Sequence, residues 1–125
     1  MKQPIVCYLY TKFDGIQKIK DFTKFYKKYR SGLKHKLVIC FKLLNTKDIE
    51  KAKKSLKKIR YQSFIDPYNI NDWDFGSYKR VAKKFYNKDV LFLNSHSYPI
   101  CHNWAKKLFY YKNKKTVIAT NASYE

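Results

Sequence analysis

Asn94, Ser95 and His96 are polar residues that directly follow a short apolar run, Val90-Leu91-Phe92-Leu93. An apolar run of this length without alternation predicts a strand buried on both faces, as in a parallel sheet. Ligands of open parallel sheets bind outside the carboxyl ends of the strands, where these three residues would lie. Asn94 and His96 are two residues apart, so both can converge on one ligand or ion. The alternative is that Asn94 and Ser95 satisfy backbone groups of the turn and that His96 faces solvent.

A second group of candidate residues precedes and begins a predicted helix, in the segment Asp72-Trp73-Asp74-Phe75-Gly76-Ser77-Tyr78-Lys79. A glycine at a helix start lets a phosphate approach the free backbone N–H groups. Asp72 and Asp74 can instead accept hydrogen bonds from a ribose or a sugar. The alternative is that Asp74 caps the helix and that Phe75 and Tyr78 pack in the core. A single glycine matches neither the P-loop nor the Gly-x-Gly-x-x-Gly motif.

Other catalytic or metal-binding patterns are weak. Ser95, His96 and Asp74 can be arranged as a triad on paper, but no Gly-x-Ser-x-Gly motif supports a hydrolase. Three widely spaced cysteines show no zinc-ligand spacing. Cys7 and Cys40 lie inside apolar runs, and disulfides are not expected, in keeping with a reducing compartment. A third polar group, which includes Asn121 and Ser123, follows the last apolar run and would lie at the same edge of the sheet.

Apolar runs and amphipathic segments alternate along the chain. Strands are predicted at residues 5–10, 37–41, 61–65, 90–93 and 116–119, and helices at 16–29, 46–60, 76–86 and 100–112. Asp14 and Thr46 are the expected N-caps of the first two helices, and Gly32 suits the end of the first. This order predicts one α/β domain with three layers, α/β/α, around a mostly parallel, Rossmann-like sheet of about five strands.

Composition restricts the class of protein. The chain has 125 residues, a net charge of +19 and 18% aromatic residues, so it is not a disordered basic tail. Only three of its 28 basic residues are arginine, which disfavours specific nucleic-acid readout and suggests a solvated lysine surface. The sequence shows neither a signal peptide nor an apolar run long enough to span a membrane, so a cytoplasmic protein is expected.

Several segments together resemble bacterial glycosyltransferase-like proteins of surface-polysaccharide (rhamnan and lipopolysaccharide) synthesis, which have a GT-A fold. The matching segments are Phe13-Asp14-Gly15, residues 72–78, residues 90–95, Trp104 and residues 117–125. The most specific is Asp-x-Gly-x-Tyr at 74–78 followed by Phe-Leu-Asn-Ser at 92–95. The resemblance implies hexosyl transfer from a nucleotide sugar to a saccharide or lipid-linked acceptor.

The resemblance also implies roles for individual residues. Asp72, Asp74, Gly76, Ser77 and Tyr78 fall beside the expected nucleotide. Asn94 and His96 fall where these enzymes usually carry Asp-x-Asp, which holds Mg²⁺ or Mn²⁺ against the diphosphate. Ser95, Asn121 and Ser123 would lie near the sugar.

Two departures from the family pattern change the expectation. Neither Asn94 nor His96 is acidic, which weakens the case for Mg²⁺ or Mn²⁺, and Lys79 or Arg80 would then face the diphosphate. The chain stops just after the fifth predicted strand, so residues 1–125 are expected to be the nucleotide-sugar-binding half without the acceptor half, inactive alone if truncated. The alternative function is a noncatalytic basic module that binds nucleic acid or an anionic membrane, such as the inner face of the cell membrane.

Overall fold

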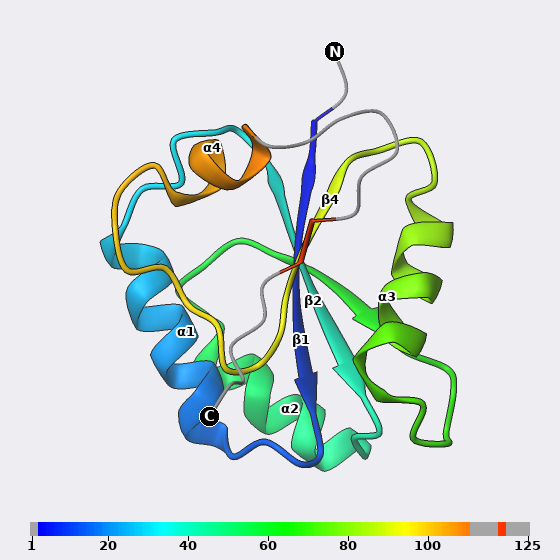
Figure 1. Ribbon diagram of the computed structural model, residues 1–125. Helices are drawn as coiled ribbons and strands as arrows, with labels where there is room; N and C mark the ends of the chain where they lie inside the picture. The colour runs from blue at the N-terminus through cyan, green and yellow to red at the C-terminus, as the bar shows by residue number, and fades with distance from the viewer. Residues whose placement is uncertain (1–2, 111–117, 120–125) are drawn as a thin grey trace.

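A five-stranded parallel sheet forms the centre of the protein (Figure 1). The computed structural model describes residues 3–110 and 118–119. The strands are β1 (Ile5–Thr11), β2 (Lys36–Lys42), β3 (Gln62–Ile65), β4 (Val90–Leu93) and β5 (Ile118–Ala119). Their order in the sheet is β3-β2-β1-β4-β5, and all four pairings are parallel. The predicted α/β fold with a parallel sheet is confirmed.

Helices cover both faces of the sheet. They are α1 (Ile16–Lys28), α2 (Thr46–Ser55), α3 (Trp73–Lys84) and α4 (Trp104–Phe109). In Figure 1, α1, α2 and α4 lie on one side of the sheet and α3 lies on the other. The three layers predicted from the sequence are therefore present.

Side chains of β1 alternate between two apolar cores. Val6, Tyr8 and Tyr10 pack with residues of α1, α2 and α4, such as Phe22. The intervening residues Ile5, Cys7 and Leu9 pack with residues of α3, such as Tyr78, Val81 and Phe85. Both faces of β1 are buried because helices lie on both, which explains the continuous apolar run.

Several helix boundaries differ from the sequence prediction. The helix predicted at 76–86 begins earlier, at Trp73, and the one predicted at 100–112 begins only at Trp104. Asn103 precedes this last helix with a left-handed backbone (φ 64°), which separates residues 100–102 from it. The helix predicted at 46–60 ends at Ser55. Of the strand predicted at 116–119, residues 116 and 117 lie outside the described residues.

Both predicted N-caps are wrong. Asn45 caps α2, because its side chain accepts a hydrogen bond of 2.8 Å from the backbone N–H of Asp48. Gly15 occupies the cap position of α1 without a side-chain bond, and the Asp14 carboxylate instead binds Thr11 and Ser95. Gly32 has the expected left-handed backbone (φ 75°), but the helix ends four residues before it.

Candidate functional site

The carboxyl ends of β1 and β4 lie side by side at the point where the strand order changes direction. From β1 the chain adds β2 and β3 on one side of the sheet, and then β4 and β5 on the other. In a doubly wound sheet the connections leave in opposite directions at this point and open a crevice between them. The loops after the two strands are joined here, since Ser95 Oγ donates a hydrogen bond of 2.7 Å to Asp14 Oδ1. The buried Tyr8 hydroxyl donates to the Ser95 carbonyl at 2.8 Å. The two loops therefore form one fixed edge.

A cleft of about 260 Å³ opens at this edge. Its walls come from the ends of β1, β2 and β4 and from the loop that leads into α3. The lining residues are Leu9, Thr11, Phe13, Asp14, Lys42, Asn71, Trp73, Asp74, Ser95 and His96. Segments that are far apart in the sequence thus supply one polar cleft with two aromatic side chains.

Two carboxylates in the cleft differ in their surroundings. Asp14 is held by hydrogen bonds from the backbone N–H and the hydroxyl of Thr11, at 2.9 and 3.0 Å, and from Ser95. Burial raises the pKa of Asp74, and the nearby Asp14 carboxylate raises it further, against smaller opposing effects of Lys42 and His96. Asp14 is therefore a positioned acceptor, and Asp74 binds a proton more readily than an ordinary aspartate.

Two aromatic side chains line the same cleft while remaining exposed. Phe13 is 66% exposed and Trp73 is 75% exposed. Trp73 also has a left-handed backbone (φ 61°), an unfavourable conformation for a bulky residue. Its N–H donates to Asn71 Oδ1 at 3.1 Å, which fixes the local turn. Exposed rings beside a polar cleft are suited to stacking on a planar base or a sugar ring.

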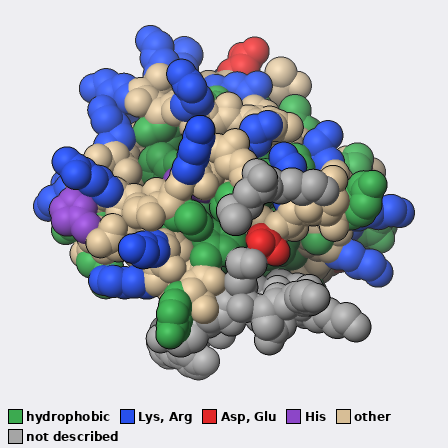
Figure 2. Space-filling view, turned by 90° about the horizontal axis from the view of Figure 1, so that it is seen from above, with side chains coloured by type: hydrophobic (Ala, Val, Ile, Leu, Met, Phe, Trp, Pro, Cys, Tyr) green, Lys and Arg blue, Asp and Glu red, His purple; other side chains and the backbone are tan. Residues whose placement is uncertain are grey.

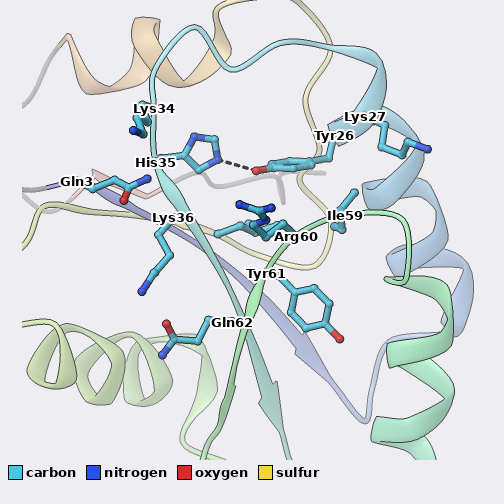
Figure 3. A pocket seen from close by; sticks show the side chains of 11 residues that line it. Gln3, Tyr26, Lys27, Lys34, His35, Lys36, Ile59, Arg60, Tyr61 and Gln62 are labelled. Carbon is cyan, nitrogen blue, oxygen red and sulfur yellow. Dashed lines mark hydrogen bonds between the residues drawn. The ribbon is translucent and has the colours of Figure 1, made fainter.

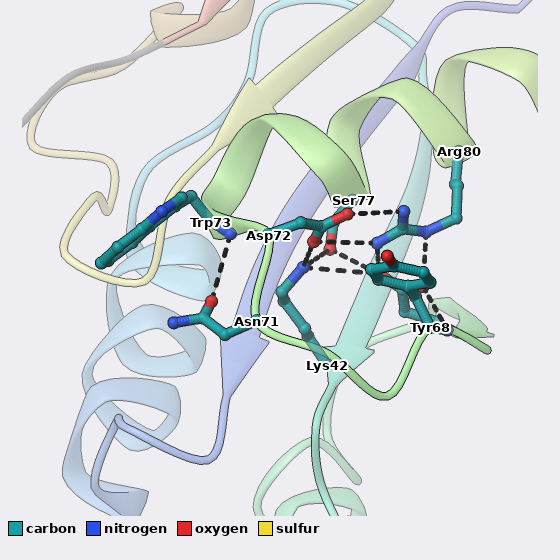
Figure 4. A network of polar contacts seen from close by, with 8 residues as sticks. Lys42, Tyr68, Asn71, Asp72, Trp73, Ser77 and Arg80 are labelled. Carbon is teal, nitrogen blue, oxygen red and sulfur yellow. Dashed lines mark hydrogen bonds and ion pairs between the residues drawn. The ribbon is translucent and has the colours of Figure 1, made fainter.

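A closed network of charges lies next to the cleft and holds the loop that carries Trp73 (Figure 4). The Arg80 guanidinium binds Asp66 in bidentate fashion, at 2.6 and 2.7 Å, and reaches Asp72 at 2.8 and 3.2 Å. The buried Lys42 ammonium binds Asp72 and donates to Ser77 Oγ at 2.9 Å. Two positive and two negative groups balance one another in this network.

The network also fixes the charge of its carboxylates. Burial alone would raise the pKa of Asp66, but hydrogen bonds from Arg80, Ser77 and the backbone of Tyr68 outweigh burial and lower it. Hydrogen bonds from Arg80 and then Lys42 hold the pKa of Asp72 far below its usual range. Both aspartates stay ionised, so the network fastens the 66–72 loop to α3 and sets the position of Trp73 and Asp74.

The predicted nucleotide-binding residues divide between the cleft and this network. Asp74 lines the cleft, while Asp72 and Ser77 belong to the network. Tyr78 is buried and stacks on Phe92 with ring centroids 4.3 Å apart, as the packing alternative predicted, whereas that alternative is wrong for Phe75, which is exposed. Beside Gly76 an added Cβ would lie only 1.8 Å from Asp72 Oδ2. The space that we expected a phosphate to approach is therefore filled by the Asp72 carboxylate.

The residues predicted to bind the diphosphate and the sugar also lie in different places. Asn94 Oδ1 accepts hydrogen bonds from the His96 N–H at 3.0 Å and from Ser97 Oγ at 2.9 Å. This confirms the turn-stabilising alternative for Asn94. Ser95 and the exposed His96 line the cleft. Asn121 and Ser123 lie outside the described residues.

The Asn94 and His96 pair does not fit a divalent cation. The Asn94 amide oxygen already accepts two hydrogen bonds within the turn, and His96 supplies no negative charge for a hard cation. Among residues 3–110, no cluster of three or more His, Cys, Asp or Glu side chains is arranged to hold a metal. The expectation of Mg²⁺ or Mn²⁺ stays a prediction.

Several residues of the cleft have no site role in the sequence prediction, among them Phe13, Asp14, Lys42 and Trp73. Asp14 is predicted to cap a helix, and Phe13 and Asp14 lie in a segment that carries the resemblance. A usable signal exists for two of these residues: Asp14 follows β1 closely, and Lys42 ends a strand whose interior is apolar. Neither signal points to the cleft until the neighbours of β1 in the sheet are known.

Comparison of the chain with protein-family models, curated proteins and solved structures found no match. In the part of the chain that the structure describes, no helix combines the length and apolar character needed to cross a bilayer. The cleft and its chemistry therefore carry the functional argument.

Proposed function

We propose that the cleft between β1 and β4 binds a nucleotide-sugar donor, and that the chain is a glycosyltransferase-like protein of cell-surface polysaccharide synthesis. The observation that carries this proposal is the place of the cleft. It lies at the strand-order reversal of a parallel sheet, where folds of this kind bind nucleotides. Three of the segments that carry the resemblance, at 13–15, 72–78 and 90–95, contribute side chains to the lining of this cleft.

Hydroxyl groups of a ribose or a sugar suit the two carboxylates. Asp14 and Asp74 can each accept hydrogen bonds from vicinal hydroxyls, and hydrogen bonds to charged acceptors are the stronger kind. Phe13 and Trp73 line the same cleft and can stack on the base or the sugar ring. These contacts define a site for the uncharged parts of the donor.

The diphosphate must lie away from the two carboxylates, since like charges repel at short range. Lys42 does not offset them, because its ammonium is already paired with Asp72. Arg80 is likewise engaged by Asp66 and Asp72, so it is not available as the counter-charge expected from the sequence. His96, exposed and in the cleft lining, is the side chain that we assign to face the diphosphate.

In the reaction that we propose, an acceptor hydroxyl on a saccharide or a lipid-linked saccharide attacks the anomeric carbon. The bond from that carbon to the diphosphate breaks, the nucleoside diphosphate leaves with the electron pair, and the proton of the acceptor hydroxyl is released to water. No step of this proposal depends on a metal ion.

Calorimetric titration with uridine and guanosine diphosphate sugars tests the binding claim. We expect saturable binding that discriminates between the bases, and Asp74→Asn should weaken it about tenfold through loss of a charged acceptor. The matched control is Asp48→Asn, which removes the same charge from the exposed first turn of α2. Equal affinity for both bases, or equal loss in both variants, would count against the proposal.

One observation favours the second candidate function, a noncatalytic basic module. A groove between α1 and α2 is lined by seven lysines, and no acidic side chain of the described part of the chain contributes to its lining. These lysines are Lys20, Lys24, Lys27, Lys28, Lys54, Lys57 and Lys58. Such a surface would bind nucleic acid or an anionic membrane through many weak phosphate contacts.

The salt dependence of binding distinguishes the two candidate functions. Binding through lysines to a polyanion falls steeply as salt rises, in proportion to the phosphates neutralised. Binding of a sugar nucleotide in the cleft should fall less and should depend on the base. Titrations of an oligonucleotide, of anionic vesicles and of the sugar nucleotide at several salt concentrations measure these slopes.

A further inference from the structure

A second and larger cavity, of about 550 Å³, lies at the opposite edge of the sheet (Figure 3). It is formed where β2 and β3 begin and where α1 ends. Its lining comprises Gln3, Tyr26, Lys27, Lys34, His35, Lys36, Leu37, Ile59, Arg60, Tyr61 and Gln62. In Figure 3, Lys34 and His35 lie on one side of this amino-edge cavity and Tyr26 and Lys27 on the other.

Positive charge surrounds the amino-edge cavity, and none of the described residues that line it carries a carboxylate. Lys27, Lys34, Lys36 and Arg60 are all exposed at its rim. The ion pairs found among the described residues join Lys42 and Arg80 to Asp66 and Asp72, and none involves these four cations. Figure 2 looks onto the edge where the strands begin and shows many lysine and arginine side chains but few acidic ones.

Neutral aromatic and apolar side chains complete the lining. His35 Nδ1 lies 2.8 Å from the Leu33 carbonyl, to which it donates a hydrogen bond. His35 Nε2 lies at hydrogen-bond distance, 2.7 Å, from the Tyr26 hydroxyl, and burial raises the pKa of Tyr26 to about 12. The Tyr26 and His35 rings meet edge to face, with centroids 5.9 Å apart. The two rings are therefore fixed in orientation.

We propose that the amino-edge cavity binds a small organic molecule that carries two or more phosphate groups. Four cations at the rim, which have no ion-pair partner among the described residues, suit the charge of such a group, because a terminal phosphate carries about two negative charges. The neutral aromatic and apolar lining suits its organic body. The volume lies within the range of small-molecule sites, roughly 300–1,000 Å³. An extended polyanion fits the lysine-lined groove between α1 and α2 better than this concave site.

The inference is independent of the proposed function. The residues that carry it come from the starts of β2 and β3 and the end of α1, whereas the donor cleft is formed at the carboxyl ends of β1, β2 and β4. Either site can be removed without altering a lining residue of the other.

Titration calorimetry at one fixed, near-physiological ionic strength tests the inference. The probes are ATP, inorganic tripolyphosphate and adenosine, with vesicles containing a phosphorylated inositol lipid and a short single-stranded oligonucleotide as further arms. We expect ATP to bind more tightly than tripolyphosphate and far more tightly than adenosine. The double variant Lys36→Gln/Arg60→Gln should weaken ATP binding at least tenfold.

The matched control is Lys51→Gln/Lys79→Gln, which removes two positive charges from exposed positions on α2 and α3. It should change ATP affinity less than twofold. Equal weakening by both double variants would show that diffuse positive charge attracts ATP, and would overturn the inference. Binding of the vesicles or of the oligonucleotide without binding of ATP would overturn it as well, as would equal affinity for ATP and tripolyphosphate.

A second measurement does not depend on the folding of a variant. In the unmodified protein, ATP should shift the backbone amide NMR signals of residues 34–37 and 59–62 and leave those of residues 11–14 unchanged. The reverse pattern would contradict the inference while leaving the donor cleft intact.

Discussion

Trp73 combines a left-handed backbone with a mostly exposed side chain, at the lip of the donor cleft. The left-handed conformation costs an L-residue about 1–2 kcal/mol, and glycine adopts it freely. Trp73→Gly should therefore leave the free energy of unfolding within about 1 kcal/mol of the parent, since relief of strain offsets the entropy of the unfolded glycine. The same variant should weaken binding of the nucleotide sugar about tenfold, through loss of a stacking ring.

Trp73→Leu is the control for that prediction. It removes the ring but keeps the backbone strain, so it should be less stable than the glycine variant and bind equally weakly. Urea unfolding and calorimetry measure the two quantities. A glycine variant that is less stable than the leucine variant would show that the indole stabilises the fold.

Asp66 makes the stability of the charge network beside the cleft depend on pH. Its pKa is lowered in the folded protein, so its contribution to stability is complete above the unfolded value of about 3.9 and disappears as pH falls through the folded value. The free energy of unfolding should therefore decrease below about pH 4. Asp66→Asn should cost about 3 kcal/mol at neutral pH, because Arg80 and Lys42 lose a buried partner, and should flatten the acid dependence.

Urea unfolding at neutral pH and at two acidic values measures both effects. Asp21→Asn, on α1, is the matched control, and its acid dependence should remain that of the parent. An unchanged acid dependence in Asp66→Asn would contradict this account of the network.

At the scale of single residues, sequence patterns predicted polar groups at the right edge but not their partners. Asp72 was placed near the nucleotide, whereas it binds Lys42 and Arg80. The partner Lys42 is 30 residues away in the sequence. A contact of that separation depends on the packing of β2 beside α3, which no local pattern contains.

Helix α3 contains a glycine in its first turn that would ordinarily weaken it. By helix propensity alone, Gly76→Ala should stabilise the helix by about 1 kcal/mol. The new Cβ would, however, lie 1.8 Å from Asp72 Oδ2 and displace that carboxylate from the buried Lys42 ammonium. We predict a net loss of about 1–3 kcal/mol in the free energy of unfolding, because the buried Lys42 ammonium loses its closest carboxylate and this loss outweighs the gain in helix propensity.

A double-mutant cycle with Asp72→Ala isolates this effect. Without the Asp72 carboxylate, Gly76→Ala should become neutral or stabilising by up to about 1 kcal/mol. Thermal or urea unfolding of the four proteins gives the coupling. The same cost of Gly76→Ala in both backgrounds would show that the clash with Asp72 does not limit this helix.

At the scale of elements, strand positions were predicted well and helix ends less so. The apolar runs of β1, β2 and β4 are continuous because helices bury both faces, and that signal is local. The start of α3 at Trp73 depends on the 66–72 loop being fastened by Asp66 and Asp72. The sequence pattern predicts that this helix starts at Gly76. A local pattern carries no information on a tertiary contact of this kind.

The whole molecule separates its charges between the two edges of the sheet. Asp14, Asp66, Asp72 and Asp74 gather at the carboxyl edge, whereas the cavity at the amino edge is ringed by lysine and arginine. A net charge of +19 therefore does not describe either site.

The alternation of strands and helices was sufficient to predict the layers and the parallel sheet. It did not establish that β4 lies beside β1, which brings Ser95 to Asp14. Strand order depends on which helix covers which face of the sheet. The apolar runs of the strands resemble one another, so they do not indicate which strands are neighbours. The donor cleft is a consequence of that order.

The most direct test of the account is to locate a bound sugar nucleotide by backbone amide NMR. The Lys36→Gln/Arg60→Gln variant should be used, so that the amino-edge cavity does not compete for the diphosphate. A uridine or guanosine diphosphate sugar is predicted to shift the amides of residues 12–15, 72–75 and 94–97 in a saturable manner. Shifts confined to any other surface, or no shifts with either nucleotide, would contradict a donor site between β1 and β4.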